Sequence, residues 1–237
     1  RAGGNESGIP TVNGAIVFDD RYIGKPLVYC GTVGILPRHL PDGRESHIKT
    51  PEPGDVIYMV GGRVGSDGIH GATFSSLELT DESPSSAVQI GDPITQKKML
   101  DMLLEARDAG QIQVITDNGA GGLSSSIGEM AKESGGFIVN LEKVPLKYQG
   151  LYPWEIWVSE SQERMTLAVH PSKIKKVIDR FNKRGVEATL IGKFIKEKKA
   201  IVKYNKIDVL NLDMEFLHEG YPKLNLKTIK PKQKGQR

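Results

Sequence analysis

Apolar and polar residues follow two different patterns along the chain, and the change falls near residue 55. From there onward, short apolar runs alternate with longer segments in which apolar residues recur every three or four positions. The run 56–60 predicts a strand that leads into glycines. Asp92 followed by Pro93 predicts a helix start, because Asp is a preferred N-cap and proline fits the first helical position. Gly110 is expected to end this helix. Its inward-facing residues are predicted to be Ile94, Met99, Met102, Leu103 and Ala106.

The same periodicity predicts further elements up to residue 212. Strands are expected at 112–115, 137–141, 165–169, 188–191, 200–204 and 208–212. Helices are expected at 124–132, 153–159 and 171–184. Repeated alternation of strands and helices is typical of a layered α/β fold, in which helices cover a sheet.

The residues before this region predict a different unit. Two strand-like runs, at 15–18 and 26–36, are joined by a polar turn. Two strands cannot form a domain alone, so we expect them to belong to a sheet that is mostly encoded upstream. The stretch 38–54 is rich in proline, glycine and charge, which indicates a domain boundary. From about residue 222 the chain is predicted to be a linker or a frayed end.

Composition narrows the class of protein. The 237 residues are 38% hydrophobic and 26% charged, as in ordinary globular proteins. The net charge of +3 belongs to residues 221–237, which hold five Lys, one Arg and no acid; residues 1–220 carry a net charge of −3. Elsewhere acidic residues interrupt the lysines, which favours a solvated face over a nucleic-acid site. No apolar stretch approaches the about 20 residues of a membrane span, so a cytoplasmic protein is expected. The single Cys30 excludes an intrachain disulfide, and its apolar surroundings favour a buried thiol over a reactive one.

A glycine-rich loop at 61–73 is the first candidate site. Gly65, Gly68 and Gly71 lie in it, and glycines let backbone N–H groups converge on a phosphate or another anion. A purely structural loop is the alternative, because the spacing matches neither the P-loop nor the dinucleotide fingerprint.

Asp117 is the second candidate, at the end of the predicted strand 112–115 and before a run of small residues. Open α/β sheets place ligands at such strand ends. Its carboxylate suits Mg²⁺, which needs one or two carboxylates when phosphates supply other ligands. The alternative is that Asp117 caps the following helix.

A polar cluster at 159–165 and the loop residue Gln89 are the third candidate. Their planar hydrogen-bonding groups suit a polyol or amide substrate. A solvated strand edge and an ordinary loop glutamine are the alternatives. The five histidines are dispersed and show no metal-binding spacing.

Five segments together resemble phosphoribosylformylglycinamidine synthase, a member of the aminoimidazole ribonucleotide synthetase superfamily. They occur in that family's order and span roughly residues 8–210. The segments are 8–14 with Phe18 and Asp19, 61–76 (GGRVGSDGIHGATFSS), 89–93 (QIGDP), 116–130 (TDNGAGGLSSSIGEM) and 159–165 (SESQERM). In the glycine loop, Val64 and Ser66 stand where many relatives carry Thr and Arg.

The resemblance implies a synthase of two similar halves, each pairing a small ferredoxin-like domain with a larger α/β domain of mixed sheet and flanking helices. Residues 1–50 would be the end of the first small domain and 51–212 the first large domain. Residues 213–237 would be a basic linker toward a second half that lies outside this chain.

The resemblance also implies a reaction and its site. With ATP and Mg²⁺, such an enzyme activates the amide of formylglycinamide ribonucleotide, and ammonia from a glutaminase subunit or domain then displaces phosphate. By position, Gln89, Glu160, Ser161 and Gln162 resemble substrate-binding residues, and Asp117 resembles a magnesium ligand. The family's catalytic histidine and nucleotide-binding lysine would lie upstream of Arg1, so no catalytic residue is expected here and the isolated chain should be inactive.

Two other functions remain open. The first is another ATP-using enzyme of the same superfamily, such as an aminoimidazole ribonucleotide synthetase. The segment 159–165 argues against it. A non-catalytic module that binds nucleic acid or a partner through its lysine-rich tail is the alternative from a different class, and such binding would depend strongly on salt.

Overall fold

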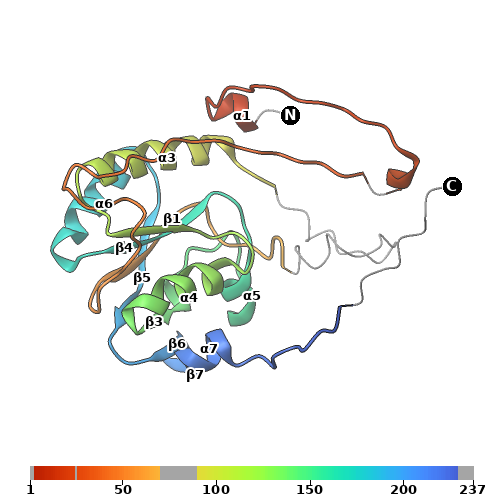
Figure 1. The fold of residues 1–237 in the computed structure, drawn as a ribbon. Helices are drawn as coiled ribbons and strands as arrows, with labels where there is room; N and C mark the ends of the chain where they lie inside the picture. Colours follow the sequence, from red (N-terminus) through yellow and green to blue (C-terminus); the bar gives the residue numbers. More distant parts are fainter. Residues whose placement is uncertain (1–2, 25, 70–89, 229–237) are drawn as a thin grey trace.

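A seven-stranded sheet forms the centre of the molecule (Figure 1). The computed structural model describes residues 3–24, 26–69 and 90–228. The strands lie in the order β2-β4-β1-β5-β3-β6-β7, and of their pairings only β3 with β6 is parallel. Their bounds are β1 Val56–Gly61, β2 Val114–Asp117, β3 Gly136–Asn140, β4 Arg164–Val169, β5 Ala188–Ile195, β6 Lys199–Tyr204 and β7 Ile207–Asp213. The prediction of a mixed sheet flanked by helices is confirmed.

Helices cover both faces of the sheet, and β1 shows why. Successive side chains of a strand point to opposite faces. Ile57 and Met59 belong to a core cluster with α4 (Gly122–Ser134) and α5 (Pro153–Val158). Tyr58 and Val60 belong to a second cluster with α3 (Pro93–Asp108) and α6 (Ile174–Asn182). A strand buried on both faces reads as a continuous apolar run, as 56–60 does.

Helix α3 begins and ends close to where the sequence indicates. The Asp92 carboxylate accepts hydrogen bonds from the amides of Ile94 and Thr95, which satisfies two N–H groups that the first turn leaves free. Gly110, just beyond the helix, has a φ of +62°. The predicted inward residues are buried except Ile94, which lies in the first turn of the helix and is 61% exposed.

Other boundaries differ by a few residues from those predicted. The predicted helix 171–184 starts as the 3-10 turn η4 (Pro171–Lys173) before α6, and η3 (Leu141–Lys143) follows β3. The region 213–237, predicted as a linker, begins with a helix, α7 (Met214–Glu219). Met214 is 5% exposed and packs into the core, so the packed part of the chain extends past residue 212 into α7.

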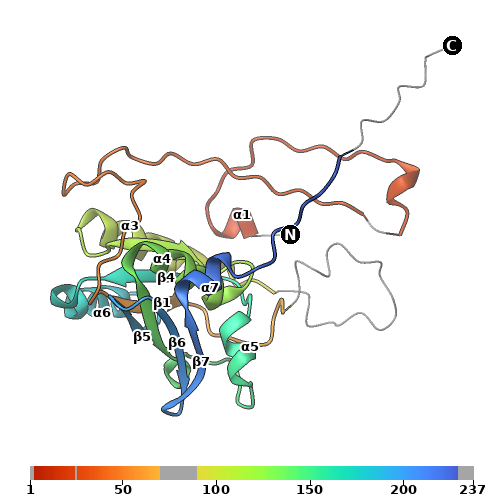
Figure 2. The same ribbon diagram turned by 60° about the horizontal axis from the view of Figure 1, so that its bottom comes forward.

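The N-terminal residues stand away from the sheet (Figure 2). Between the short helix α1 (Gly3–Glu6) and residue 36 the chain runs out to the 3-10 turn η1 (Asp20–Tyr22) and back. The predicted strands 15–18 and 26–36 are not paired as strands among the described residues. Cys30 is exposed rather than buried, because none of the described residues forms a second layer over the apolar run that contains it.

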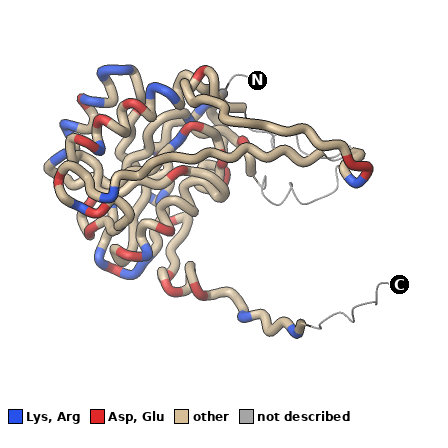
Figure 3. The backbone as a smooth tube through the Cα atoms, turned by 45° about the horizontal axis from the view of Figure 1, so that its top comes forward, with Lys and Arg blue, Asp and Glu red and all other residues tan. Residues whose placement is uncertain are grey.

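This extension carries little charge (Figure 3). All charged residues between 9 and 36 lie at 19–25, near its tip. Its apolar side chains are largely exposed, for instance Phe18 at 93% and Tyr29 at 87%. Within the described parts of the chain, no helix has the length and apolar character that crossing a membrane requires.

Candidate functional site

Two of the predicted site segments lie side by side because β2 and β4 are antiparallel neighbours. Asp117, the last residue of β2, is opposite Met165 near the start of β4. The turn 159–163 therefore enters β4 next to the residues that follow Asp117. The buried side chain of Asn118 strengthens this contact, since its Oδ1 accepts hydrogen bonds from Ser126 at 2.6 Å and Thr166 at 2.8 Å.

Glycine is required where α4 passes the turn. Gly122 has a φ of +55°, and a Cβ there would lie 2.0 Å from the carbonyl oxygen of Ser159. The amide of Gly121 donates to Glu160 Oε1 at 3.2 Å. The small residues after Asp117 thus allow the turn and α4 to touch. Gly121 is also the N-cap of α4, without a side-chain cap, so Asp117 does not cap this helix.

Ser161 lies at the centre of the turn and connects it to the glycine-rich loop. Its Oγ accepts a hydrogen bond from the amide of Gly65 at 2.9 Å and donates to the Asp67 carboxylate. Lys147 pairs with the same carboxylate at 2.6 Å. Burial tends to raise the pKa of Asp67, but the hydrogen bonds from Lys147 and Ser161 outweigh it and lower the pKa below its ordinary value. Asp67 is therefore an anion at neutral pH.

Arg164, the first residue of β4, is buried beneath the turn. Its Nε donates to the Ser161 carbonyl and its Nη2 to the Ser159 carbonyl, each at 2.6 Å. Only 3% of the residue is exposed. Desolvation lowers the pKa of Arg164 to about 10, while the charges of Asp67 and Glu160 act in the opposite direction. The guanidinium remains charged at neutral pH and supports the turn from inside.

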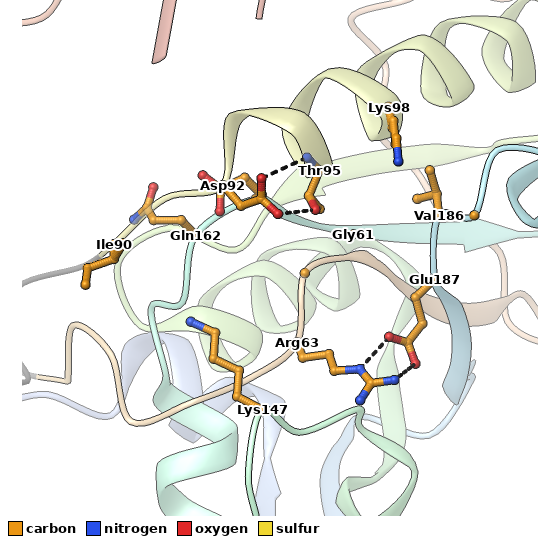
Figure 4. Close-up of a pocket in the computed structure, with 13 residues that line it drawn as sticks. Gly61, Arg63, Ile90, Asp92, Thr95, Lys98, Lys147, Gln162, Val186 and Glu187 are labelled. Atoms are coloured by element: carbon orange, nitrogen blue, oxygen red, sulfur yellow. Dashed lines mark hydrogen bonds and ion pairs between the residues drawn. The ribbon is translucent and has the colours of Figure 1, made fainter. Parts of the chain in front are cut away.

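A cleft of about 320 Å³ opens beside this turn (Figure 4). Gln162 is exposed there, and Lys147 reaches toward it from the far side. Burial raises the pKa of Glu163, which has a φ of +56°. The lining combines glycine backbone with groups of both charges and comprises Gly61, Gly62, Arg63, Ile90, Asp92, Thr95, Lys98, Lys147, Gln162, Glu163, Gly185, Val186 and Glu187.

The structure brings together most, but not all, of the predicted residues. Glu160, Ser161 and Gln162 share one turn, and Gly65 and Asp117 lie near it. Gly68 is buried with a φ of +69° in the glycine-rich loop. The amide of Gly65 donates to a protein hydroxyl, which uses the group that was predicted to contact phosphate. The predictions for Gln89 and Gly71 fall outside the described residues.

Sequence reasoning missed Asp67 and Lys147, which lie 80 positions apart. No spacing rule connects them. Asp117 is exposed, and the described residues contain no group of three or more His, Cys, Asp or Glu that could hold a metal ion.

Residues 52–205 match the family described as AIR synthase related protein, C-terminal domain. The match covers more than half of the 237 residues, so the chain belongs to this family. This family is the class of protein to which the seven-stranded sheet with helices on both faces corresponds.

Within this class, the chain is similar to PurL subunits of phosphoribosylformylglycinamidine synthase. That of Thermoplasma acidophilum is 40% identical over 220 residues, which make up 92% of this chain and 28% of that subunit. The resemblance drawn from the five segments is confirmed. The chain spans less than a third of the length of this curated relative.

Solved structures give the same result. Thermotoga maritima PurL complexed with FGAR has a TM-score of 0.70 and 34% identity over 77% of this chain and 31% of that one. The same protein complexed with ATP has a TM-score of 0.64 and 30% identity, covering 77% and 28%. PurLQS from T. maritima reaches a TM-score of 0.73 at 26% identity and covers 97% of this chain and 36% of that one.

Proposed function

We propose that this chain is part of a phosphoribosylformylglycinamidine synthase, which uses ATP and glutamine to convert formylglycinamide ribonucleotide into formylglycinamidine ribonucleotide in purine synthesis. The observation that carries this proposal is the contact between the turn 159–163 and the residues after Asp117. These segments are 39 positions apart at Gly121 and Glu160, where a hydrogen bond joins them, and Gln162 and Glu163 of the same turn line a cleft. PurL complexed with FGAR has the same fold.

The proposed chemistry explains the residue types. An amide oxygen leaves poorly, so phosphoryl transfer from ATP to that oxygen creates a leaving group, and ammonia then displaces phosphate. Such transfer is catalysed mainly by positioning and by cations that face the developing negative charge. Glu160 and Gln162 are proposed to bind the polar substrate, together with Gln89. The glycines Gly65, Gly68 and Gly71 are proposed to shape the loop behind them.

Asp117 is proposed to be one ligand of Mg²⁺. Its carboxylate is exposed at a strand end, which fits a hard cation that keeps several water and phosphate ligands. The described residues contain no group of three or more His, Cys, Asp or Glu that could hold the ion by themselves. The remaining ligands, the nucleotide contacts and the catalytic base are proposed to come from polypeptide outside this chain.

The partners follow from this arrangement. Ammonia would come from a glutaminase, either a separate subunit or a fused domain, and the solved PurLQS structure supports a multi-subunit assembly. Residues 1–50 are proposed to complete a small ferredoxin-like domain, 51–212 to form the first large domain, and 213–237 to lead, through α7, to the second half. A cytoplasmic location and the inactivity of the isolated chain stay predictions.

The experiment that tests this function uses the complete synthase that contains this chain. Gln162→Ala should raise KM for formylglycinamide ribonucleotide about tenfold and leave KM for ATP nearly unchanged, because a lost substrate hydrogen bond costs ~1–2 kcal/mol. Gln149→Ala is the matched control, since Gln149 is exposed and lies outside this cleft. The proposal fails if the complete protein does not turn over this substrate, or if both variants leave its KM at the wild-type value.

A further inference from the structure

The hydroxyl of Ser161 has protein partners for all of its hydrogen-bonding capacity. It is 1% exposed, accepts from the amide of Gly65 at 2.9 Å, donates to the Asp67 carboxylate and lies 3.1 Å from Ser159 Oγ. A serine hydroxyl offers one proton and two lone pairs. Three partners use these groups completely, so no donor or acceptor is left for a ligand.

Asp67 connects the glycine-rich loop to the turn in two ways. Its carboxylate receives the Ser161 proton and also pairs with Lys147 at 2.6 Å. Its backbone carbonyl accepts a hydrogen bond from the amide of Glu160 at 2.9 Å. The loop therefore fixes both the backbone of Glu160 and the side chain that follows it.

Arg164 fixes the same turn from the inside of the protein. Its two hydrogen bonds, to the carbonyls of Ser159 and Ser161, hold both sides of Glu160. The carbonyl of Arg164 also accepts from the amide of Asn118 at 3.2 Å, next to Asp117. One buried side chain thus sets the backbone path of the turn, and its own backbone contacts the segment that carries Asp117.

Gln162 shows the opposite behaviour although it adjoins Ser161. It is exposed, lines the cleft and makes a 3.4 Å hydrogen bond from Nε2 to the carbonyl of Glu160. Such a long bond leaves its amide available to a ligand. Of the five residues of the turn, the exposed Gln162 and the half-buried Glu163 line the cleft, whereas the buried Ser159 and Ser161 do not.

We infer that the half-buried Asp67 and the buried Ser161 and Arg164 form a positioning unit, which holds Glu160 and Gln162 toward substrate without touching substrate itself. This inference rests on the proposed function of the same site. It gives Ser161 a role different from the substrate contact that the family resemblance implies. It also adds two residues, Asp67 and Arg164, that act on substrate only through the turn.

A double-mutant cycle in the complete synthase separates positioning from contact. Ser161→Ala should raise KM for formylglycinamide ribonucleotide about tenfold, because it leaves buried partners unsatisfied, while kcat changes less. In combination with Gln162→Ala, the increase should fall well below the about 100-fold product of two independent effects, because Ser161 acts through its neighbour. Ser172→Ala, at an exposed serine of η4, is the matched control and should leave KM unchanged.

Hydrogen exchange of the Gly65 amide gives a readout that does not depend on turnover. Ser161→Ala should speed this exchange, and Ser172→Ala should not. If the wild-type protein lacks activity on this substrate, the proposed function fails while the exchange result still tests the unit. The inference is overturned if the two substitutions multiply fully in KM, if Ser161→Ala leaves KM unchanged, or if Gly65 exchange is unaffected. Should Ser161→Ala not fold, as judged by circular dichroism, Asp67→Asn replaces it in the same cycle and must meet the same criteria.

Discussion

Two features of the structure require glycine at position 122: a positive φ and a close contact with the backbone. Its φ of +55° lies in the left-handed region, and the nearest atom to an added Cβ is the Ser159 carbonyl oxygen at 2.0 Å. A backbone atom cannot move aside as the end of a flexible side chain can. A side chain at this position must therefore separate α4 from the turn that carries Glu160 and Gln162.

Gly122→Ala should lower the free energy of unfolding by more than about 3 kcal/mol, because backbone strain and a clash with a carbonyl add together. Gly150→Ala is the control, since Gly150 has a φ of +95° and open space around it. That change measures the cost of positive φ alone, about 1–2 kcal/mol. Urea denaturation followed by circular dichroism measures both. Equal losses in the two variants would show that the contact with Ser159 is not tight.

At the scale of elements, the start of α3 is determined by its N-cap residue, Asp92, which can be recognised in the sequence. Asp92 accepts hydrogen bonds from the Ile94 and Thr95 amides and from the Thr95 hydroxyl, the last at 2.7 Å. Those bonds, led by the Thr95 hydroxyl, lower the pKa of Asp92 below its ordinary value. A carboxyl with a lower pKa in the folded state stabilises the protein above its unfolded pKa, about 3.9, and loses that effect as pH falls through the folded pKa.

Asp92→Ala should therefore destabilise the protein by about 1 kcal/mol at pH 7, the usual cost of a lost N-cap. The difference from wild type should shrink as pH falls from about 4, the unfolded pKa, through the lower folded pKa of Asp92. Asp108→Ala, at the exposed far end of α3, serves as the control and should change stability by less than about 0.5 kcal/mol. Urea midpoints at several pH values measure this. A difference that stays constant down to pH 2 would contradict the capping role.

Elements with such local signals could be predicted from the sequence, and those that depend on distant partners could not. The start of α3 was visible in Asp92 and Pro93, whereas Cys30 was expected inside because its apolar neighbours imply a covering layer. Strand order is equally non-local: nothing in 112–117 indicates that β2 pairs with β4 at the edge of the sheet.

The candidate site divides in the same way. The residue types in the turn 159–163 indicated a polar ligand, because their planar side chains can form hydrogen bonds with a polyol or amide substrate. The roles of Asp67 and Lys147 could not be predicted, since they arise only when the loop and the turn meet in three dimensions. Ser161 is buried and Gln162 is exposed, although they are neighbours in the chain. Loop residues have no regular alternation of buried and exposed positions, so this difference could not be predicted from the sequence.

At the scale of the whole molecule, the chain combines a well-packed sheet with an apolar extension that nothing in the described residues covers. Residues 12–36 carry many exposed apolar side chains, such as Ile16 at 85%, Val28 at 84% and Val33 at 102% exposure. Isolated monomers rarely expose contiguous apolar surface of this extent. Extended, nearly uncharged segments also present free N–H and C=O groups that can pair with another chain.

The isolated chain should therefore self-associate through this extension. Sedimentation velocity at tens of micromolar should show species larger than the monomer, and Val28→Asp combined with Val33→Asp should shift them toward monomer, because each charge opposes burial of the segment. The same double substitution should leave the unfolding midpoint of the seven-stranded sheet unchanged, since neither residue belongs to its core clusters. Leu224→Asp with Leu226→Asp is the matched control, because these leucines are 81% and 82% exposed outside the extension. A wild-type chain that sediments as a monomer, or control substitutions that dissociate it equally, would show that the extension does not drive association. On the proposal that residues 1–50 complete a small domain, the same surface is covered in the complete synthase, and there the double substitution should lower stability instead.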